Sequence, residues 1–194
     1  MVRYPSGHKE RTREQIVSAA ARAFREEGVA GVSVGELMGR AGLTHGGFYA
    51  HFRSKDDLVA EACRCAFEES TARLREAARR APPEERLAAF IGAYASPAHR
   101  DDPGGGCLMP ALSAELSRHA PEVRAAFTEV FREGIAALER QLPDEGTDRT
   151  DRALALMSGL AGAVMLARAV DDPALSDRIL QASRDVFTAA FAEK

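Results

Sequence analysis

Apolar residues recur along most of the chain at the three- and four-residue spacing of an α-helix, and Pro or Gly clusters separate the segments. This pattern predicts an all-α protein. The first helix is expected from about Lys9 to Glu27, with Gly28 where a helix stop is expected. Its apolar face consists of Ile16, Ala20, Ala23 and Phe24.

Two short helices are predicted next. Ser33 is a candidate N-cap, and Glu36 three residues later completes a capping box for a helix over residues 34–40. The tight turn Ala41-Gly42-Leu43 follows, and Thr44 is expected to cap a third short helix.

A long fourth helix is expected from Lys55 to about Arg80, with Ser54 as its cap. Five more are predicted near Glu84 to Ala95, Cys107 to Arg118, Glu122 to Leu142, Asp148 to Val170 and Ala174 to Ala192. Residues 96–106 contain two Pro and three consecutive Gly, so we expect a mobile loop there. The chain should therefore have about nine helices, in a three-helix head (1–54) and a larger helical body (55–194).

Two short helices around Gly42, packed on a longer first helix, are typical of a helix-turn-helix, whose second helix enters the DNA major groove. That helix would run from Thr44 to Phe52. Gly46 and Gly47 within it each cost about 1 kcal/mol relative to alanine. We interpret them as bare backbone that approaches DNA closely. The alternative is tight packing against another helix.

The stretch from Val32 to Leu58 resembles the DNA-binding domain of the TetR family of bacterial repressors. The resemblance covers roughly residues 10–60, from the face around Ala20, Ala21 and Phe24 to Ser54-Lys55-x-x-Leu58, while the rest of the chain is similar only in helical layout. It implies that Ser33 and Thr44 cap their helices and touch DNA, that Tyr49, His51 and Lys55 hold phosphates, and that Phe48 and Phe52 are core residues.

Few side chains remain to read bases. Thr44 and His45 are the first candidates, with Arg40 as a further one, and the Gly46-Gly47 backbone would contribute shape. For His45 and His51 the alternative is a solvated surface histidine. Arg3, Tyr4 and Lys9 form either an arm along the DNA or a disordered tail.

The resemblance also implies a homodimer on double-stranded operator DNA, with a four-helix interface formed by the last two helices of each copy. Small residues at 159 and 161–163 would let helices approach closely. The alternative is a purely internal helix pair. The candidate interface residues are Leu154, Ala161, Gly162, Met165, Ile179, Val186, Phe187 and Phe191.

In this family the body usually binds a small-molecule inducer. The candidate pocket residues include Met, Phe and one Tyr, a mixture that favours an apolar or aromatic ligand with one polar anchor. For each of these residues the alternative is ordinary core packing. These candidates are Phe90, Tyr94, Cys107, Met109, Leu112, Leu116, Phe127, Phe131, Met157 and Leu160.

Cys107 follows three glycines at the expected start of a helix, where a thiol has a lowered pKa. It is therefore a candidate sensor of electrophiles or oxidants, and residues 106–116 resemble an electrophile-responsive subgroup of the family. The alternative is a plain, partly buried cysteine. The odd number of cysteines and the lack of a C-x-x-C spacing argue against a disulfide framework and a zinc site, and favour a reducing cytoplasm.

Charge is unevenly distributed along the chain. Residues 1–55 hold nine Lys or Arg against five acids, and residues 56–194 hold seventeen against twenty-four, so the head is +4 and the body −7. A basic head on an acidic body suits a protein that presents one end to a polyanion. Solvated charge alone is the alternative.

We expect neither a membrane segment nor an enzyme. The start of the chain contains no apolar stretch typical of a signal peptide, and the uncharged run from Ala153 to Ala167 is shorter than the roughly 20 residues of a membrane span, so it predicts a buried helix. No P-loop, zincin or dinucleotide-binding motif is present, and no cofactor or metal is implied. The remaining alternative is a helical adaptor that does not bind DNA.

Overall fold

The computed structural model describes residues 7–143 and 148–191. Within these ranges the chain forms nine α-helices, two short 3₁₀-helices and no strand, as the all-α prediction requires. The elements are α1 His8–Glu27, α2 Val34–Arg40, η1 His45–Ala50, α3 Lys55–Arg79, η2 Pro83–Glu85, α4 Arg86–Tyr94, α5 Pro97–Asp101, α6 Leu108–Leu116, α7 Pro121–Glu139, α8 Arg149–Ala169 and α9 Pro173–Phe191.

The head consists of α1, α2 and η1, and local sequence signals set its boundaries. Gly28 follows α1 with a φ of 78°, a conformation that favours glycine. The Ser33 hydroxyl accepts from the Glu36 amide while the Glu36 carboxylate accepts from the Ser33 amide, which confirms the predicted capping box. Gly42 has a φ of 71° and makes the turn out of α2.

The third element of the head differs from the expected helix. η1 is a six-residue 3₁₀-helix, and Thr44 occupies its N-cap position as predicted, but the Thr44 side chain makes no capping hydrogen bond. The Gly47 amide instead donates to the Thr44 carbonyl at 3.0 Å. Two consecutive glycines weaken an α-helix, and the buried rings of Phe48 and Phe52 hold the segment in place.

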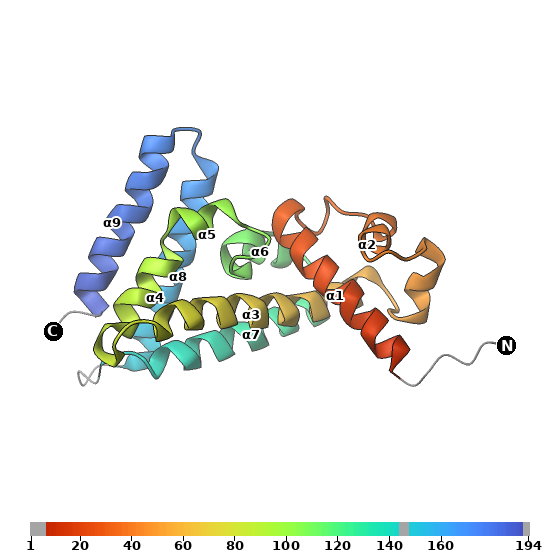
Figure 1. Ribbon diagram of the computed structural model, residues 1–194, viewed down its shortest axis with the longest axis horizontal. Helices are drawn as coiled ribbons and strands as arrows, with labels where there is room; N and C mark the ends of the chain where they lie inside the picture. Colours follow the sequence, from red (N-terminus) through yellow and green to blue (C-terminus); the bar gives the residue numbers. More distant parts are fainter. Residues whose placement is uncertain (1–6, 144–147, 192–194) are drawn as a thin grey trace.

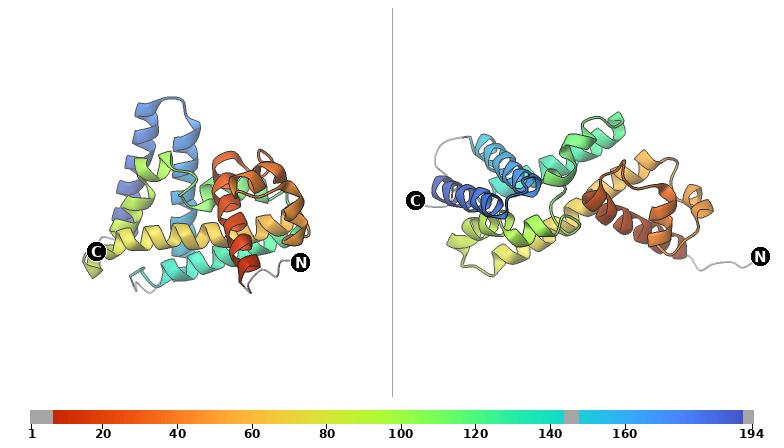
Figure 2. Two further views of the ribbon diagram at one scale, coloured as in Figure 1. Left: turned by 45° about the vertical axis from the view of Figure 1, so that its right-hand side comes forward. Right: turned by 90° about the horizontal axis from the view of Figure 1, so that it is seen from above.

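The long helices α3 and α7 run side by side and carry the body away from the head (Figure 1). Helices α8 and α9 pair at the end opposite the head, as the view from above also shows (Figure 2). One face of α8 is buried, as predicted, through Ala153, Met157, Leu160 and Val164. By length and composition alone α8 is the one helix among the described residues that fits a membrane span, but the core helix of a soluble protein passes the same test.

The prediction of a loop throughout residues 96–106 is wrong. This segment contains the helix α5, and the Ser96 hydroxyl caps that helix by accepting a hydrogen bond from the His99 amide. Arg168 on α8 donates to the carbonyls of His99 and Arg100, which fixes α5 to the body. The high Pro and Gly content of this segment therefore reflects turns around a short helix.

Candidate nucleic-acid interface and ligand cavity

The exposed face of the head is formed by the ends of α2 and η1. Ser33, Thr44, His45 and Gly46 are exposed there. The Tyr49 side chain is 70% exposed, and its ring packs edge-on against buried Phe48 with centroids 5.2 Å apart. Tyr49 thus projects from a fixed base, as a side chain that contacts a large partner should.

Gly46 lies on this face with free space around it, and Gly47 beside it is half-buried. A Cβ atom at Gly46 would have no neighbour within 4 Å, and one at Gly47 would meet only Met38 Cε at 3.5 Å, an ordinary contact. Neither glycine has a positive φ. Tight packing within this chain, the alternative reading of the pair, therefore does not require glycine at either position.

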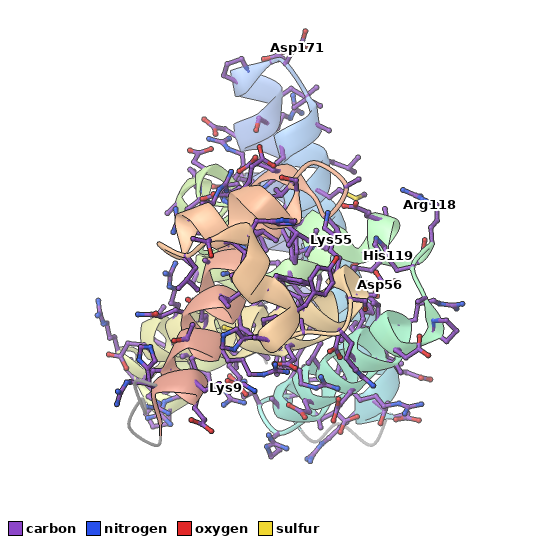
Figure 3. The ribbon with its side chains drawn as sticks, turned by 90° about the vertical axis from the view of Figure 1, so that its right-hand side faces the viewer. Lys9, Lys55, Asp56, Arg118, His119 and Asp171 are labelled. Carbon is purple, nitrogen blue, oxygen red and sulfur yellow. The ribbon has the colours of Figure 1, made fainter. Side chains whose placement is uncertain are left out.

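Lys55 points into the head, and we revise its expected role. Its ammonium group donates hydrogen bonds to the carbonyls of Val29 and Val32 and lies 5.9 Å from the centre of the Phe24 ring. Figure 3 places Lys55 within the junction of head and body, whereas Lys9 lies at the edge of the head. Lys55 therefore holds the segment between α1 and α2 against the start of α3, and it does not belong to the exposed face.

Arg40 is also directed away from the exposed face. Its guanidinium pairs with Glu27 at 2.6 Å, and this hydrogen bond raises its pKa. The side chain lines a hollow with residues of α1 and α3. The structure therefore does not bring Arg40 together with His45 and Tyr49.

The His51 ring is partly buried at the end of η1. Burial lowers its pKa, and the positive charges of Lys9 and Arg13 lower it further. Its Nδ1 atom is buried without a hydrogen-bond partner among the described residues. At neutral pH His51 is therefore uncharged, and it would offer a phosphate a single N–H donor.

Arg13 is a structural residue of the head that sequence reasoning missed. Its guanidinium donates to the His51 carbonyl and to Glu61, and it stacks 4.3 Å from the centre of the Phe52 ring. Arg13 thus joins α1, the end of η1 and α3. Its place on α1 gives no signal of these partners, which come together only in the fold. Arg3 and Tyr4 lie outside the described residues.

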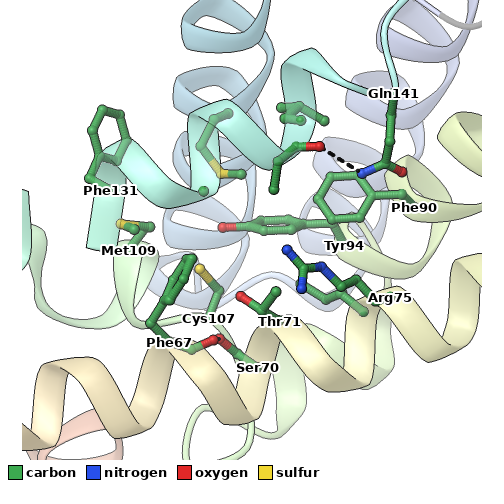
Figure 4. Close-up of a pocket in the computed structure, with 15 residues that line it drawn as sticks. Phe67, Ser70, Thr71, Arg75, Phe90, Tyr94, Cys107, Met109, Phe131 and Gln141 are labelled. Carbon is green, nitrogen blue, oxygen red and sulfur yellow. Dashed lines mark hydrogen bonds between the residues drawn. The ribbon is translucent and has the colours of Figure 1, made fainter. Parts of the chain in front are cut away.

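A cavity of about 40 Å³ lies inside the body. Helices α3, α4, α6, α7 and α8 all contribute to its lining (Figure 4). Six of the predicted residues line it: Phe90, Tyr94, Cys107, Met109, Phe131 and Met157. The other four are not among the lining residues, and Leu112, Leu116 and Leu160 are buried in the core while Phe127 packs against it. For these four, the alternative of core packing is the better description.

Sequence reasoning missed the contribution of α3 to the cavity. Phe67, Ser70, Thr71, Leu74 and Arg75 share one face of this helix by their spacing of three and four, and they line the cavity. That spacing was the available signal.

Cys107 is the N-cap of α6 but is buried, with 6% exposure. Burial raises its pKa, and the neighbouring Tyr94 hydroxyl, Arg25 and Arg168 offset this only in part. The predicted lowering of the Cys107 pKa is therefore wrong, because desolvation outweighs the helix terminus. Burial also raises the pKa of Cys63 to about 12 and that of Cys65 to about 11.

Two contacts join the cavity region to the head. The buried Arg25 side chain on α1 donates to the carbonyl of Gly106, the residue before Cys107, at 3.1 Å. At the other end of α6, the Glu115 carboxylate accepts from the amides of Val29 and Ala30 at 2.9 and 2.7 Å. Within the body, His119 just beyond α6 contacts Asp56 at the start of α3 (Figure 3). A shift of α6 would thus move the segment that precedes α2.

Apolar side chains are exposed on α8 and α9. None of the eight candidate interface residues is fully buried, and Met165 and Val186 are 47% and 62% exposed. Five of the eight, Leu154, Ala161, Ile179, Phe187 and Phe191, pack against the core of the same chain. Leu166 and Leu175, which we did not predict, are exposed as well. Gly159 belongs to the interior, since a Cβ there would come within 2.3 Å of the Phe187 ring, whereas Gly162 has open space around it.

A helix-turn-helix head on a helical body with an internal cavity defines a class of transcription regulators. Residues 16–62 match the family model for bacterial regulatory proteins of the tetR family, and residues 83–183 match the model for a tetracyclin repressor-like C-terminal domain. The chain therefore belongs to the TetR family.

Individual relatives agree with this assignment. The HTH-type transcriptional regulator AcrR of Shigella flexneri is 39% identical over 61 residues, which are 31% of this chain and only 28% of AcrR. The HTH-type transcriptional repressor DhaR of Mycobacterium sp. (strain GP1) is 25% identical over 75% of this chain and 74% of DhaR. The reduced form of E. coli NemR shares the fold, with a TM-score of 0.78 at 22% identity over 95% of this chain and 98% of NemR.

Proposed function

We propose that this protein is a transcription repressor that binds a palindromic DNA operator as a homodimer, with η1 in the major groove. The observation that carries the proposal is the Gly46-Gly47 backbone, exposed at Gly46 and half-buried at Gly47, for which neither backbone conformation nor packing within the chain requires glycine. A side chain at Gly46, where the space around a Cβ is open, would hold the backbone away from DNA. The basic head and acidic body favour the same orientation.

The DNA contacts that we propose differ from the expected set. Ser33, Thr44, His45, Gly46, Gly47 and Tyr49 remain, with His51 as a neutral phosphate donor. Lys55 and Arg40 act within the head instead, since both are bound to other groups of the chain. Specificity then rests on few side chains, on DNA shape and on the spacing of two heads.

A dimer through α8 and α9 would supply the second head. The exposed apolar residues on these helices need a partner, and a face built from both helices forms a four-helix interface when two copies meet. The pair lies at the end of the body farthest from the head (Figure 2). Dimerisation there would leave both heads free for DNA.

Release from DNA would follow from ligand binding in the cavity. Cys107 and Met109 line the cavity at the start of α6, and Glu115 at its end holds the amides of Val29 and Ala30. A ligand that displaces α6 would therefore shift the helix-turn-helix. We propose a small apolar or aromatic inducer that binds without a covalent bond.

The alternative of a thiol sensor at Cys107 is weaker, because burial and a raised pKa leave little thiolate at neutral pH. Maleimide labelling of a variant that keeps only Cys107 tests it directly. A thiol that reacts rapidly at pH 7 and abolishes DNA binding on modification would favour the sensor.

The test of the proposed function is an electrophoretic shift assay with duplex DNA selected from a randomised pool. We expect a palindromic consensus that is bound by two copies of the chain, with an affinity that falls as salt rises. A helical adaptor or an enzyme would yield no consensus at moderate salt, and that result would overturn the proposal.

A further inference from the structure

The Tyr94 hydroxyl is the unusual polar group of the cavity. The side chain is fully buried, and its oxygen has no hydrogen-bond partner among the described residues. Figure 4 shows the hydroxyl directed toward the side of the cavity formed by Cys107 and Met109. Burial raises the pKa of Tyr94, and a weak interaction with the adjacent Cys107 thiol raises it further, but a thiol is a weak acceptor and makes no hydrogen bond of normal geometry with this hydroxyl.

Other polar side chains of the lining are already bonded. The Ser70 hydroxyl donates to the Phe67 carbonyl at 3.2 Å, and the Gln141 side-chain amide donates to the Ala137 carbonyl at 3.3 Å. Among the described lining residues, Tyr94 is the one with a buried polar side-chain atom that lacks a partner. A buried donor of this kind is unfavourable unless something binds it.

The lining also excludes a charged group from the interior of the cavity. It contains no Asp or Glu to pair with a cation, and its one cationic side chain, Arg75, is exposed. Apolar side chains, four of them aromatic and two of them thioethers, form most of the remaining wall. Burying a charge against these groups would be unfavourable, so the part of a ligand that reaches Tyr94 must be uncharged.

A second hollow suggests how a ligand enters. A surface groove of about 310 Å³ lies between α3, α4 and the α5–α6 segment. Ser70, Leu74 and Cys107 line both the groove and the cavity. These three side chains separate the groove from the cavity, so a ligand that enters from the groove must displace them. Cys107 immediately precedes the first residue of α6.

We propose that the cavity, once Ser70, Leu74 and Cys107 are displaced and it opens into the groove, binds a small uncharged ligand that is apolar over most of its surface and carries one hydrogen-bond-accepting oxygen, such as that of an aryl ketone, which accepts from the Tyr94 hydroxyl. This rests on the proposed function and specifies the inducer chemistry. The oxygen supplies the acceptor that the protein lacks, while Phe67, Phe90 and Phe131 contact the rest of the ligand.

The test compares two probes of nearly the same shape. Acetophenone carries a carbonyl oxygen where α-methylstyrene carries a CH₂ group, and the dissociation constant of each is measured by calorimetric titration. Between the wild type and Tyr94→Phe, the ratio of the two constants should change by about tenfold, the range of one net hydrogen bond. Ser70→Ala is the matched control, because the Ser70 hydroxyl is already bonded and its removal should leave the ratio unchanged.

Thermal unfolding of the same variants checks whether the Tyr94 hydroxyl is unpaired in the free protein. Tyr94→Phe should be at least as stable as the wild type, because it removes an unpaired buried hydroxyl. The inference is overturned if Tyr94→Phe leaves the ratio unchanged, or if neither probe binds the wild type at millimolar concentration. Probe binding as expected without any DNA consensus would instead overturn the proposed function and leave the ligand chemistry standing.

Discussion

Lys55 occupies a position where the family resemblance implies a phosphate contact, yet its ammonium group binds two main-chain carbonyls of the segment between α1 and α2. A sequence motif gives the type of side chain at a position but not its direction. Tyr49 differs, because its ring stands clear of the surface on top of Phe48. The two residues should therefore respond differently to substitution.

Lys55→Ala should lower the free energy of unfolding by about 1–3 kcal/mol, because two carbonyls lose a charged donor. DNA affinity should fall because the head is less stably folded. The slope of log affinity against log salt should equal that of the wild type, because no phosphate contact is lost. Thermal unfolding and shift assays at several salt concentrations measure both quantities.

Tyr49→Phe is the matched comparison, since the hydroxyl of an exposed side chain can be removed without loss of stability. It should weaken DNA binding and leave thermal unfolding unchanged. A Lys55→Ala variant as stable as the wild type, with a shallower salt slope, would show that Lys55 holds a phosphate after all.

At the scale of elements, α6 is the connection between cavity and head. Its first turn contributes Met109 to the cavity, and Glu115 in its last turn binds the α1–α2 segment. Glu115→Ala should increase amide exchange at Val29 and Ala30 by about tenfold or more, because charge-assisted bonds are lost there. Hydrogen-exchange NMR or mass spectrometry measures this.

Glu129→Ala is the control for the loss of a carboxylate. Glu129 makes an exposed ion pair with Arg64, which contributes little to stability. Exchange at residues 29 and 30 should therefore match the wild type. If Glu115→Ala also left this exchange unchanged, α6 would not hold the head in place.

His99 in α5 gives the molecule a pH dependence. Its Nδ1 atom donates to the Tyr94 carbonyl, and its Nε2 atom accepts from the Cys107 amide, so the ring is neutral. Burial lowers its pKa, Arg168 adds to this, and the Tyr94 carbonyl and Asp102 oppose it. As the pH falls below about 6.5, the unfolded chain takes up a proton that the folded chain does not, and stability falls.

Chemical denaturation between pH 5 and 7.5 measures this effect. His99→Gln, which keeps a donor and an acceptor, should weaken the pH dependence. An unchanged pH dependence in His99→Gln would mean that His99 contributes nothing to it. His51 has a pKa lowered in the same direction, so part of the dependence should persist in the variant.

The elements themselves were predictable to different degrees. The capping box at Ser33, the stop at Gly28 and the cap at Ser54 fix helix ends through local contacts, and the structure confirms all three. The 3₁₀ form of η1 and the helix α5 were not predictable, because they depend on partners distant in sequence. Phe48 and Phe52 pack into the head, and Arg168 on α8 binds α5.

The same distinction holds for the cavity at the scale of the whole molecule. Six of its residues were predicted from apolar helix faces, but the choice between cavity and core for Leu112 or Leu160 depends on how five helices meet. The predicted lowering of the Cys107 pKa is wrong for the same reason. Its place at a helix start is local, whereas its burial is a property of the assembled body.

The exposed face of α8 and α9 predicts the oligomeric state. Val186→Glu should convert a dimer to a monomer, as measured by analytical ultracentrifugation, because a charge would be buried in the interface. DNA affinity should fall with it. Ala125→Glu on α7 is the control, since it adds the same charge at an exposed position away from α8 and α9. Dimers that persist in Val186→Glu would place the interface elsewhere.

The central claim is that the Gly46-Gly47 backbone meets DNA closely, and alanine substitution tests it most directly. Both positions accept a Cβ in the free chain, so Gly46→Ala and Gly47→Ala should unfold at the wild-type temperature or above it. Gly92→Ala, in the body with its nearest neighbour at 3.9 Å, is the matched control and should bind the selected duplex like the wild type.

The deciding measurement is the affinity of Gly46→Ala for the selected duplex, taken with its thermal stability. We predict a loss of at least about tenfold in affinity with no loss of stability, because a methyl group at this open position would separate the backbone from the DNA. Wild-type affinity in a stable Gly46→Ala variant, alone and combined with Gly47→Ala, would contradict the account.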